Sequence, residues 1–153
     1  MPVVKFKKLR EGAKIPQKRS EGAAAYDIYY PDEEPLTLYP SPWRAVNIVP
    51  TGLAVEIPPG WKGEIYSRSG LASEGIWVVN QPGKIDCDYR GEIKILVYNS
   101  SRDPVTLTRG ARIAQLEVNP VHEVQWEEDT ELTPSKRGEA GFGSTGWQGK
   151  LNL

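Results

Sequence analysis

Short apolar runs, separated by glycine and proline, follow one another along the whole chain. Residues 92–95 (Glu-Ile-Lys-Ile) alternate between polar and apolar, and this period of two is typical of a strand that buries one face. The other runs are rich in Val, Ile, Leu, Tyr and Trp. We expect strands at residues 3–6, 26–30, 45–49, 53–57, 76–79, 93–98 and 113–118.

Glycine and proline are too frequent for long helices. The chain has 15 glycines and 13 prolines, and inside a helix Pro costs about 3 kcal/mol and Gly about 1 kcal/mol relative to Ala. The one helix candidate is a short turn over residues 69–74, which Ser69 could cap. Many short strands joined by turns are typical of a sandwich, jelly roll or barrel, so the sequence predicts an all-β fold.

The C-terminal segment differs in composition from the rest of the chain. Residues 127–135 are acidic and polar, as in a linker. Residues 136–153 are rich in glycine and carry too few large apolar side chains to fold alone. We therefore expect a single β domain over residues 1–126, a linker over 127–135 and a flexible arm over 136–153.

Composition and charge exclude several classes of function. Of 153 residues, 39% are hydrophobic and 25% charged, and the formal net charge is −1, which gives no general attraction to nucleic acid or to an anionic membrane. One cysteine and one histidine exclude a disulfide framework and a Cys/His zinc cluster. No apolar stretch approaches the roughly 18 residues of a membrane span, and the first residues do not resemble a signal peptide. We therefore expect a soluble, cytoplasmic protein.

The arm contains a glycine-rich motif whose usual interpretation fails. Residues 141–146 (Gly-Phe-Gly-Ser-Thr-Gly) match G-x-G-x-x-G, but too few residues follow for the βαβ unit of a dinucleotide fold. The segment could still bind an anion through backbone N–H groups, two hydroxyls and the charges of Lys136 and Arg137. Phe142 could stack on a base. The alternative is a tail without function.

Residues 80–92 hold the densest group of reactive side chains. If residues 85–90 are extended, Asp86, Asp88 and Arg90 share one face of the strand. Two carboxylates beside a guanidinium form either a structural ion-pair network or a site that activates water, because an ionised aspartate can act as a general base. The pattern alone leaves both interpretations open.

Three shorter motifs add groups that could bind phosphate or metal. A strand that ends at Arg68 and a helical turn that starts at Ser69 would gather backbone N–H groups, a guanidinium and a hydroxyl around an anion, although Ser69 could simply be a cap. Gln115 would be partly buried and would bind either a ligand or the backbone. Asp27, at the start of a strand, could be a ligand or a structural hydrogen-bond acceptor.

In their order along the chain, these motifs together resemble the five motifs of the trimeric dUTPase family. The resemblance lies in A-A-A-Y-D (23–27), R-S-G-L-A (68–72), N-Q-P-G-K-I-D-C-D-Y-R-G-E (80–92), G-A-R-I-A-Q (110–115) and R-G-E-A-G-F-G-S-T-G (137–146). It extends from about residue 20 to residue 147. Ala25, Ser67 and Ala140 stand where the family usually has Gly, Pro and Gly, and none of these departures removes a group assigned to chemistry.

The resemblance implies a homotrimer of distorted jelly-roll or β-clip-like subunits that hydrolyses dUTP to dUMP and pyrophosphate with Mg²⁺. This reaction keeps uracil out of DNA and supplies dUMP for dTMP synthesis. Asp86 would deprotonate the water that attacks the α-phosphorus, and Asp27 would organise the metal-bound triphosphate through water. Each site would combine the first, second and fourth motifs of one subunit, the third motif of another and the arm of the third subunit.

The same resemblance assigns the substrate contacts. Tyr89 would pack beneath the deoxyribose and exclude a 2′-hydroxyl, while Asn80 and the backbone that follows it would recognise uracil. Arg137 would close over the γ-phosphate, and Phe142 would stack on uracil. The full substrate-binding set is Arg68, Ser69, Gly70, Asn80, Gly83, Lys84, Ile85, Tyr89, Gln115, Arg137, Phe142, Gly143, Ser144 and Thr145.

Two other functions stay open at this point. A dCTP deaminase, or a bifunctional deaminase and dUTPase of the same fold, would need a glutamate, and Glu64, Glu74 and Glu92 are available. The third and fifth motifs follow the dUTPase pattern more closely. A non-catalytic β module that binds nucleotides would not need Asp86. In every case we expect no nucleic-acid or membrane partner.

Overall fold

The computed structural model describes residues 1–43 and 45–141, and the chain divides into two units, residues 1–122 and residues 123–153. All helices and strands of the described chain lie in the first unit. In the second unit, the described residues 123–141 form turns and irregular structure. No helix within the described ranges has the length and apolar character needed to cross a membrane.

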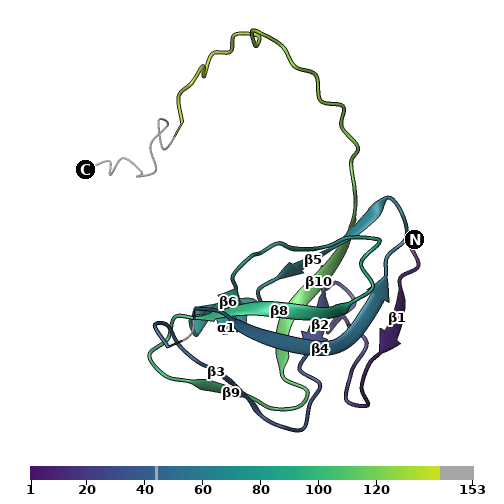
Figure 1. The fold of residues 1–153 in the computed structure, drawn as a ribbon, viewed down its shortest axis with the longest axis vertical. Coiled ribbons are helices and arrows are strands. Elements are labelled where there is room, and N and C mark those ends of the chain that lie inside the picture. Colours follow the sequence, from purple (N-terminus) through teal and green to yellow (C-terminus); the bar gives the residue numbers. More distant parts are fainter. Residues whose placement is uncertain (44, 142–153) are drawn as a thin grey trace. The chain divides into compact units, whose positions relative to one another are not determined.

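Antiparallel strands form two four-stranded sheets and one two-stranded sheet (Figure 1). The larger sheets have the orders β1-β4-β8-β6 and β2-β10-β5-β7, and β3 pairs with β9. The elements are β1 (Lys5–Lys8), β2 (Tyr26–Tyr29), β3 (Leu36–Leu38), β4 (Asn47–Glu56), β5 (Trp61–Tyr66), α1 (Ser69–Ser73), β6 (Ile76–Val78), β7 (Gly83–Ile85), β8 (Glu92–Asn99), β9 (Val105–Leu107) and β10 (Arg112–Pro120). The predicted all-β, jelly-roll-like fold is confirmed.

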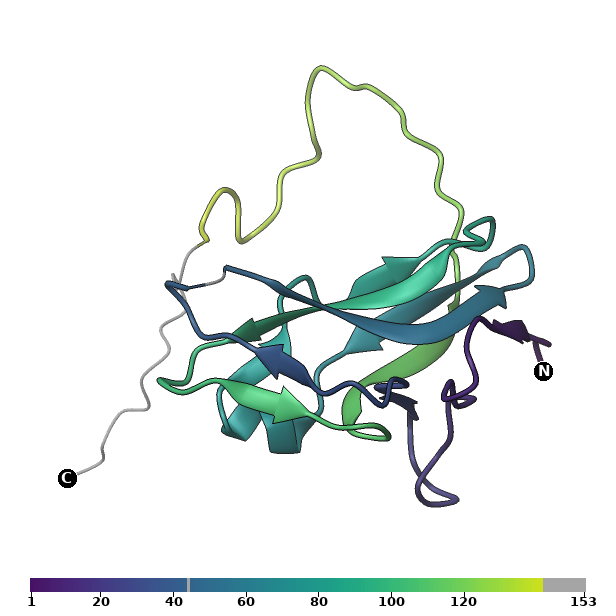
Figure 2. The same ribbon diagram turned by 60° about the horizontal axis from the view of Figure 1, so that its bottom comes forward.

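One hydrophobic core joins the two larger sheets, which lie in two layers (Figure 2). Along β8, every second residue from Ile93 is buried, as the alternation in the sequence predicted. These residues pack with inward-facing residues of the second sheet, such as Ile28, Ile65 and Leu116. Since β8 buries one face in this core, its opposite face is free to carry polar groups.

The two runs predicted at residues 45–49 and 53–57 belong to a single strand, β4. Its pairing with β8 is interrupted between Pro50 and Ala54, where Gly52 has a φ of +67°. This left-handed conformation favours glycine. The interruption keeps one strand continuous while it bends, and it turns the Gly52 amide towards the side chain of Glu92 (2.8 Å).

The helical turn is present, but Ser69 is not its cap. The N-cap residue of α1 is Arg68, and no side chain caps the helix by a hydrogen bond. The strands β3 and β9 were not predicted, because three residues each are too few to show a period. Strand β1 also starts later than expected, at Lys5, and all four of its residues are exposed.

Asn99, at the end of β8, is fully buried and connects three segments. Its Nδ2 donates to the carbonyl oxygens of Leu38 (2.9 Å) and Asp103 (3.1 Å), and its Oδ1 accepts from the Ser101 amide (2.9 Å). The two-stranded sheet is therefore held to β8 by a buried amide.

We expect Asn99→Ala to lower the free energy of unfolding by about 1–3 kcal/mol, because it leaves buried backbone groups without partners. Urea denaturation at one fixed protein concentration measures this change. Thr106→Ala, at an exposed position of β9, is the control and should cost less than about 1 kcal/mol. Equal effects of the two substitutions would contradict the role of Asn99.

Candidate active site

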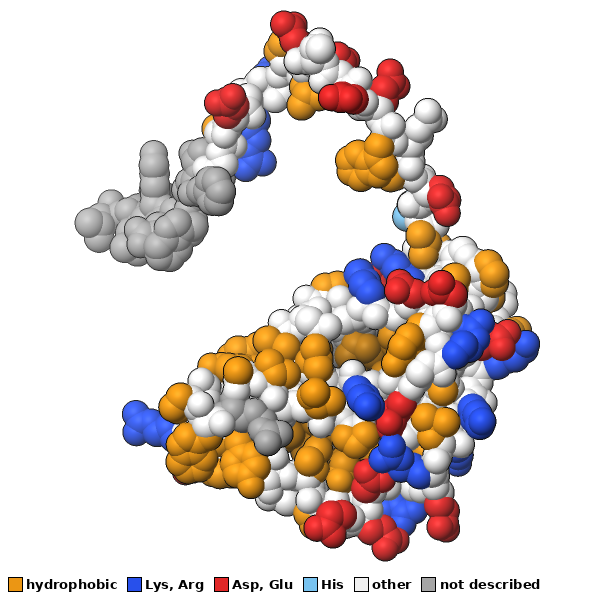
Figure 3. Space-filling view, in the orientation of Figure 1, with side chains coloured by type: hydrophobic (Ala, Val, Ile, Leu, Met, Phe, Trp, Pro, Cys, Tyr) orange, Lys and Arg blue, Asp and Glu red, His pale blue; other side chains and the backbone are white. Residues whose placement is uncertain are grey.

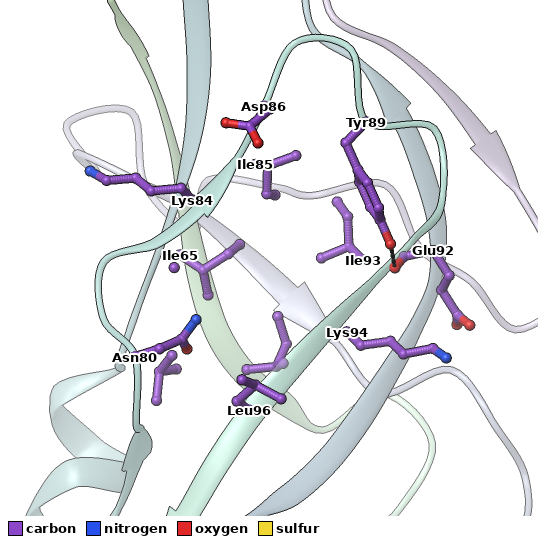
Figure 4. A pocket seen from close by; sticks show the side chains of 13 residues that line it. Ile65, Asn80, Lys84, Ile85, Asp86, Tyr89, Glu92, Ile93, Lys94 and Leu96 are labelled. Atoms are coloured by element: carbon purple, nitrogen blue, oxygen red, sulfur yellow. Dashed lines mark hydrogen bonds between the residues drawn. The ribbon is translucent and has the colours of Figure 1, made fainter.

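A pocket of about 230 Å³ opens beside β7, next to the residues that follow β6 and the start of β8 (Figure 4). The rest of its wall is mostly apolar and comes from β5, β6 and β8. Six residues of the third motif that were assigned to substrate binding or catalysis line it. They are Asn80, Gly83, Lys84, Ile85, Asp86 and Tyr89.

Asp86 directly follows β7 and begins a turn. The Tyr89 amide donates to the Asp86 carbonyl oxygen at 3.1 Å. Residues 85–90 are therefore not extended throughout, and the shared face of two aspartates and an arginine, which depended on that condition, is not formed. The Arg90 guanidinium instead donates to the carbonyl oxygens of Cys87 (2.7 Å) and Tyr89 (3.1 Å).

The Asp86 carboxylate is exposed and unpaired within the described chain. No described residue donates a hydrogen bond to it or forms an ion pair with it. The structural ion-pair interpretation therefore has no support at this position. A carboxylate with free lone pairs at the mouth of a pocket can accept a proton from water.

The Asn80 side chain lies against Gly83. A Cβ atom at residue 83 would be 3.3 Å from Asn80 Nδ2 and 3.6 Å from Oδ1, so glycine lets the amide approach β7 closely. The amide of Asn80 makes no hydrogen bond with any residue of the described ranges. Its donor and its acceptor are both available to a ligand with complementary groups.

Lys84 contributes its backbone to the pocket, and its side chain points away (Figure 4). Its ammonium group donates to Glu64, which is 6% exposed on β5. Glu64 also accepts from Asn119 Nδ2 (2.6 Å) and pairs with Lys62 (3.1 Å). These donors, with Lys84 first, lower the pKa of Glu64 to about 2 despite its burial.

A second pocket, of about 320 Å³, lies against β2 and β10. Asp27, Arg68, Ser69 and Gln115 line it, so the structure brings together the first, second and fourth motifs. Gly70 is exposed on α1 and lines neither pocket. The two pockets have no lining residue in common, so the predicted residues fall into two separate groups on the chain.

Asp27 is 7% exposed and lies between two arginines. Its Oδ1 accepts from Arg68 Nε (3.0 Å) and its Oδ2 from Arg112 Nη1 (3.1 Å). Arg68 Nη1 also donates to the Arg112 carbonyl oxygen (3.2 Å). Asp27 therefore acts as a structural acceptor, and it fixes the orientation of Arg68.

Gln115 also forms the structural contact that its burial required. Its Nε2 donates to the Ser67 carbonyl oxygen at 2.8 Å. This bond connects β10 to the segment that leads into α1. The side-chain oxygen of Gln115 has no hydrogen-bond partner among the described residues, and Gln115 lines the second pocket.

Sequence reasoning missed two arginines of the second pocket. Arg112 lies within the fourth motif but was given no role, and its bond to Asp27 spans 85 positions. Arg19 also lines the pocket and makes no hydrogen bond or ion pair with the described residues. With Arg68, these residues place three guanidinium groups beside two carboxylates, Asp27 and Glu117. An anionic ligand would be favoured there.

Of the predicted arm residues, Arg137 is described. It is exposed, and its Nε donates to the Ala140 carbonyl oxygen at 3.0 Å. Phe142, Gly143, Ser144 and Thr145 lie outside the described residues.

The described residues hold no group of three or more His, Cys, Asp or Glu side chains that could bind a metal directly. Each Asp27 oxygen accepts one arginine hydrogen bond and keeps a second lone pair, so it can still bind a water molecule. Such a water could in turn contact a hydrated Mg²⁺ ion, which usually keeps several waters and binds substrate phosphates.

Comparison with known proteins gives consistent matches over most of the chain. A family model described as dUTPase matches residues 11–146. The deoxyuridine 5'-triphosphate nucleotidohydrolase of Anaeromyxobacter sp. (strain Fw109-5) is 47% identical over 133 residues, which is 86% of this chain and 87% of the relative. The protein of the same name from Rickettsia felis is 39% identical over 94% of this chain and 96% of its own.

Solved structures share the fold. The Staphylococcus bacteriophage 80alpha dUTPase with dUPNHPP has a TM-score of 0.79 and 28% identity, covering 95% of this chain and 99% of its own. A mutant dUTPase of phage phi11 of S. aureus, which shows the coordination of a structural Mg(II) ion, has a TM-score of 0.74 and 23% identity over 86% of this chain and 99% of its own.

The charge cluster around Glu64 predicts a pH dependence of stability. Because its pKa is lowered from 4.5 to about 2 in the folded state, the unfolded chain takes up a proton first as the pH falls. The stability that the ionised carboxylate provides is complete above about pH 4.5 and is lost as the pH falls towards 2. Glu64→Gln should therefore flatten the fall in unfolding free energy over this range.

Urea denaturation at a series of pH values measures this dependence. Glu74→Gln is the matched control, since Glu74 is exposed and forms no ion pair with a described residue; its pH profile should follow that of the unchanged protein. A Glu64→Gln profile as steep as the control would contradict the assignment.

Proposed function

Because the chain belongs to the dUTPase family and is a dUTP diphosphatase, we propose that Asp86 is the general base of this reaction. The observation that carries the proposal is an exposed carboxylate, without a described partner, at the mouth of a pocket that the unpaired Asn80 side chain also lines. Asp86 would take a proton from water as the oxygen of that water attacks the α-phosphorus. The bond from the α-phosphorus to the bridging oxygen breaks, and pyrophosphate leaves.

Uracil would occupy the first pocket. The free amide of Asn80 and the backbone of β7 would pair with the donors and acceptors on the edge of the base. Cytosine reverses two of these groups, and a site left with unpaired buried polar groups can discriminate by roughly 10⁴–10⁵-fold. Tyr89 would lie beneath the deoxyribose.

The triphosphate would bind at the second pocket. Arg68, Ser69, Gly70 and Gln115 would contact the phosphate oxygens, and Arg68 is oriented for this by its bond to Asp27 (3.0 Å). Guanidinium groups stabilise the charge that develops on the phosphates during attack. Mg²⁺ would be held by the triphosphate and by water bound to Asp27, where it would neutralise phosphate charge.

We propose that a homotrimer combines the two pockets. They share no lining residue within one chain, so base and triphosphate contacts would come from different subunits. An apolar surface supports association: hydrophobic side chains gather over β4, β6 and β8 (Figure 3), and Trp43, Ile48 and Val79 are exposed. Patches of this kind often mark protein interfaces.

The arm of a third subunit would complete the site. Arg137, Ser144 and Thr145 would close over the γ-phosphate, and Phe142 would stack on uracil. Closure of such a segment excludes water and completes the site only when substrate is bound.

Deamination of dCTP is not favoured, because none of the three candidate glutamates is free in either pocket. Glu64 is held by two lysines and Asn119. Glu92 accepts from Arg10 (2.7 Å) and from Gly52. Glu74 is exposed and lines neither pocket.

We expect Asp86→Asn to reduce kcat for dUTP by roughly 10²–10⁴-fold, the usual contribution of a general base. The affinity for dUTP should stay within about tenfold, since the base acts in the transition state. Pyrophosphate release and tryptophan fluorescence measure the two quantities. Asp88→Asn, at an exposed residue of the same turn, is the control, and normal turnover by Asp86→Asn would refute the proposal.

Deletion of residues 136–153 should abolish turnover and leave the trimer assembled, because the arm would close the site without holding the subunits together. Pyrophosphate release and analytical ultracentrifugation test both parts. An active truncated protein would contradict closure by the arm, and a monomeric one would assign the arm to assembly.

A further inference from the structure

The Tyr89 ring lies directly against Gly91. A Cβ atom at residue 91 would be 2.4 Å from Tyr89 Oη, 2.6 Å from Cζ and 3.0 Å from Cε2. No side chain can occupy that space while the ring keeps its position. Gly91 is not among the described glycines with positive φ. Glycine is therefore needed at this position because there is no room for a side chain, and not because of its backbone conformation.

The hydroxyl of Tyr89 is held by the residue after Gly91. It donates to the Glu92 carbonyl oxygen at 3.0 Å (Figure 4). The Glu92 carboxylate, only 15% exposed, accepts from Arg10 Nη2 at 2.7 Å and from the Gly52 amide at 2.8 Å. The carbonyl that holds the hydroxyl therefore belongs to a residue tied to two other segments of the chain.

We propose that Gly91 is a positioning residue for Tyr89 and thereby sets the preference of the site for 2′-deoxyribose over ribose. The inference rests on the proposed function, in which the ring packs beneath the sugar. The hydroxyl end of the ring lies against Gly91, and the hydroxyl bonds the Glu92 carbonyl oxygen, so both contacts fix where the ring lies. A ring displaced from Gly91 would leave room for a 2′-hydroxyl.

The test is the ratio of kcat/KM for dUTP to kcat/KM for UTP, measured by pyrophosphate release. We expect Gly91→Ala to lower this ratio by roughly tenfold to a hundredfold, the cost of misplacing a contact group by about 1 Å. The clash falls on the far end of the Tyr89 side chain, at a residue that is 46% exposed. The ring can therefore give up its bond to Glu92 and rotate outward, and the variant should fold, which thermal melting checks.

Gly22→Ala is the matched control. A Cβ atom at residue 22 meets no atom within 4 Å, and its φ is not in the left-handed region. This variant should keep the dUTP to UTP ratio of the unchanged protein.

A double-mutant cycle separates positioning from general damage. If Gly91 acts through Tyr89, adding Gly91→Ala to Tyr89→Ala produces no further fall in the ratio. Additive effects on the ratio, or equal losses on both substrates in Gly91→Ala, would overturn the inference.

Tyr89→Phe removes only the bond to Glu92 and should lower the ratio less than Gly91→Ala does. An unchanged ratio in Tyr89→Phe would contradict the role of that bond, even if Gly91→Ala failed to fold.

The same measurements distinguish this inference from the proposed function. An unchanged ratio in Tyr89→Ala would refute the place assigned to the sugar. A lowered ratio in Tyr89→Ala together with an unchanged ratio in Gly91→Ala would refute only the role of Gly91.

Discussion

The ion cluster of Asp27 with Arg68 and Arg112 joins three motifs that are far apart in the sequence. A buried carboxylate is stable only when its charge is paired and hydrogen-bonded, so Asp27 dictates where both guanidinium groups lie. Sheet topology makes the cluster possible, because β10 pairs with β2 on one side and with β5 on the other. The second pocket is therefore a product of strand order.

The same electrostatic rule shapes the opposite edge of this sheet. Glu64 lies on β5, between β10 and β7. Its register partners are Glu117 on β10 and Lys84 on β7. The two lysines and the amide of Asn119 compensate the buried Glu64 charge. Because this cluster draws the Lys84 side chain away from the first pocket, Lys84 contributes its backbone to that pocket.

Features that local pattern determines could be predicted, and features that depend on distant partners could not. The alternation in β8 reflects one buried face, and it was visible in the sequence. The motif containing Asn80 and Asp86 gave residues that share one pocket.

The contacts between residues far apart in the sequence could not be predicted. The contact of Arg10 with Glu92 spans 82 positions and that of Arg112 with Asp27 spans 85, and no local spacing reveals them. The turn after β7 was also missed, since a hydrogen bond between backbone groups leaves no mark on side-chain pattern.

The separation of the two pockets on one chain has a consequence for how the protein works in a cell. Under the proposed arrangement, an isolated subunit carries a base pocket and a triphosphate pocket that belong to different active sites, so it has no complete active site. Catalytic output would then follow the degree of self-association, and it would fall more steeply than abundance when the protein becomes scarce. A substitution in one subunit would likewise impair the active sites that this subunit shares with its neighbours.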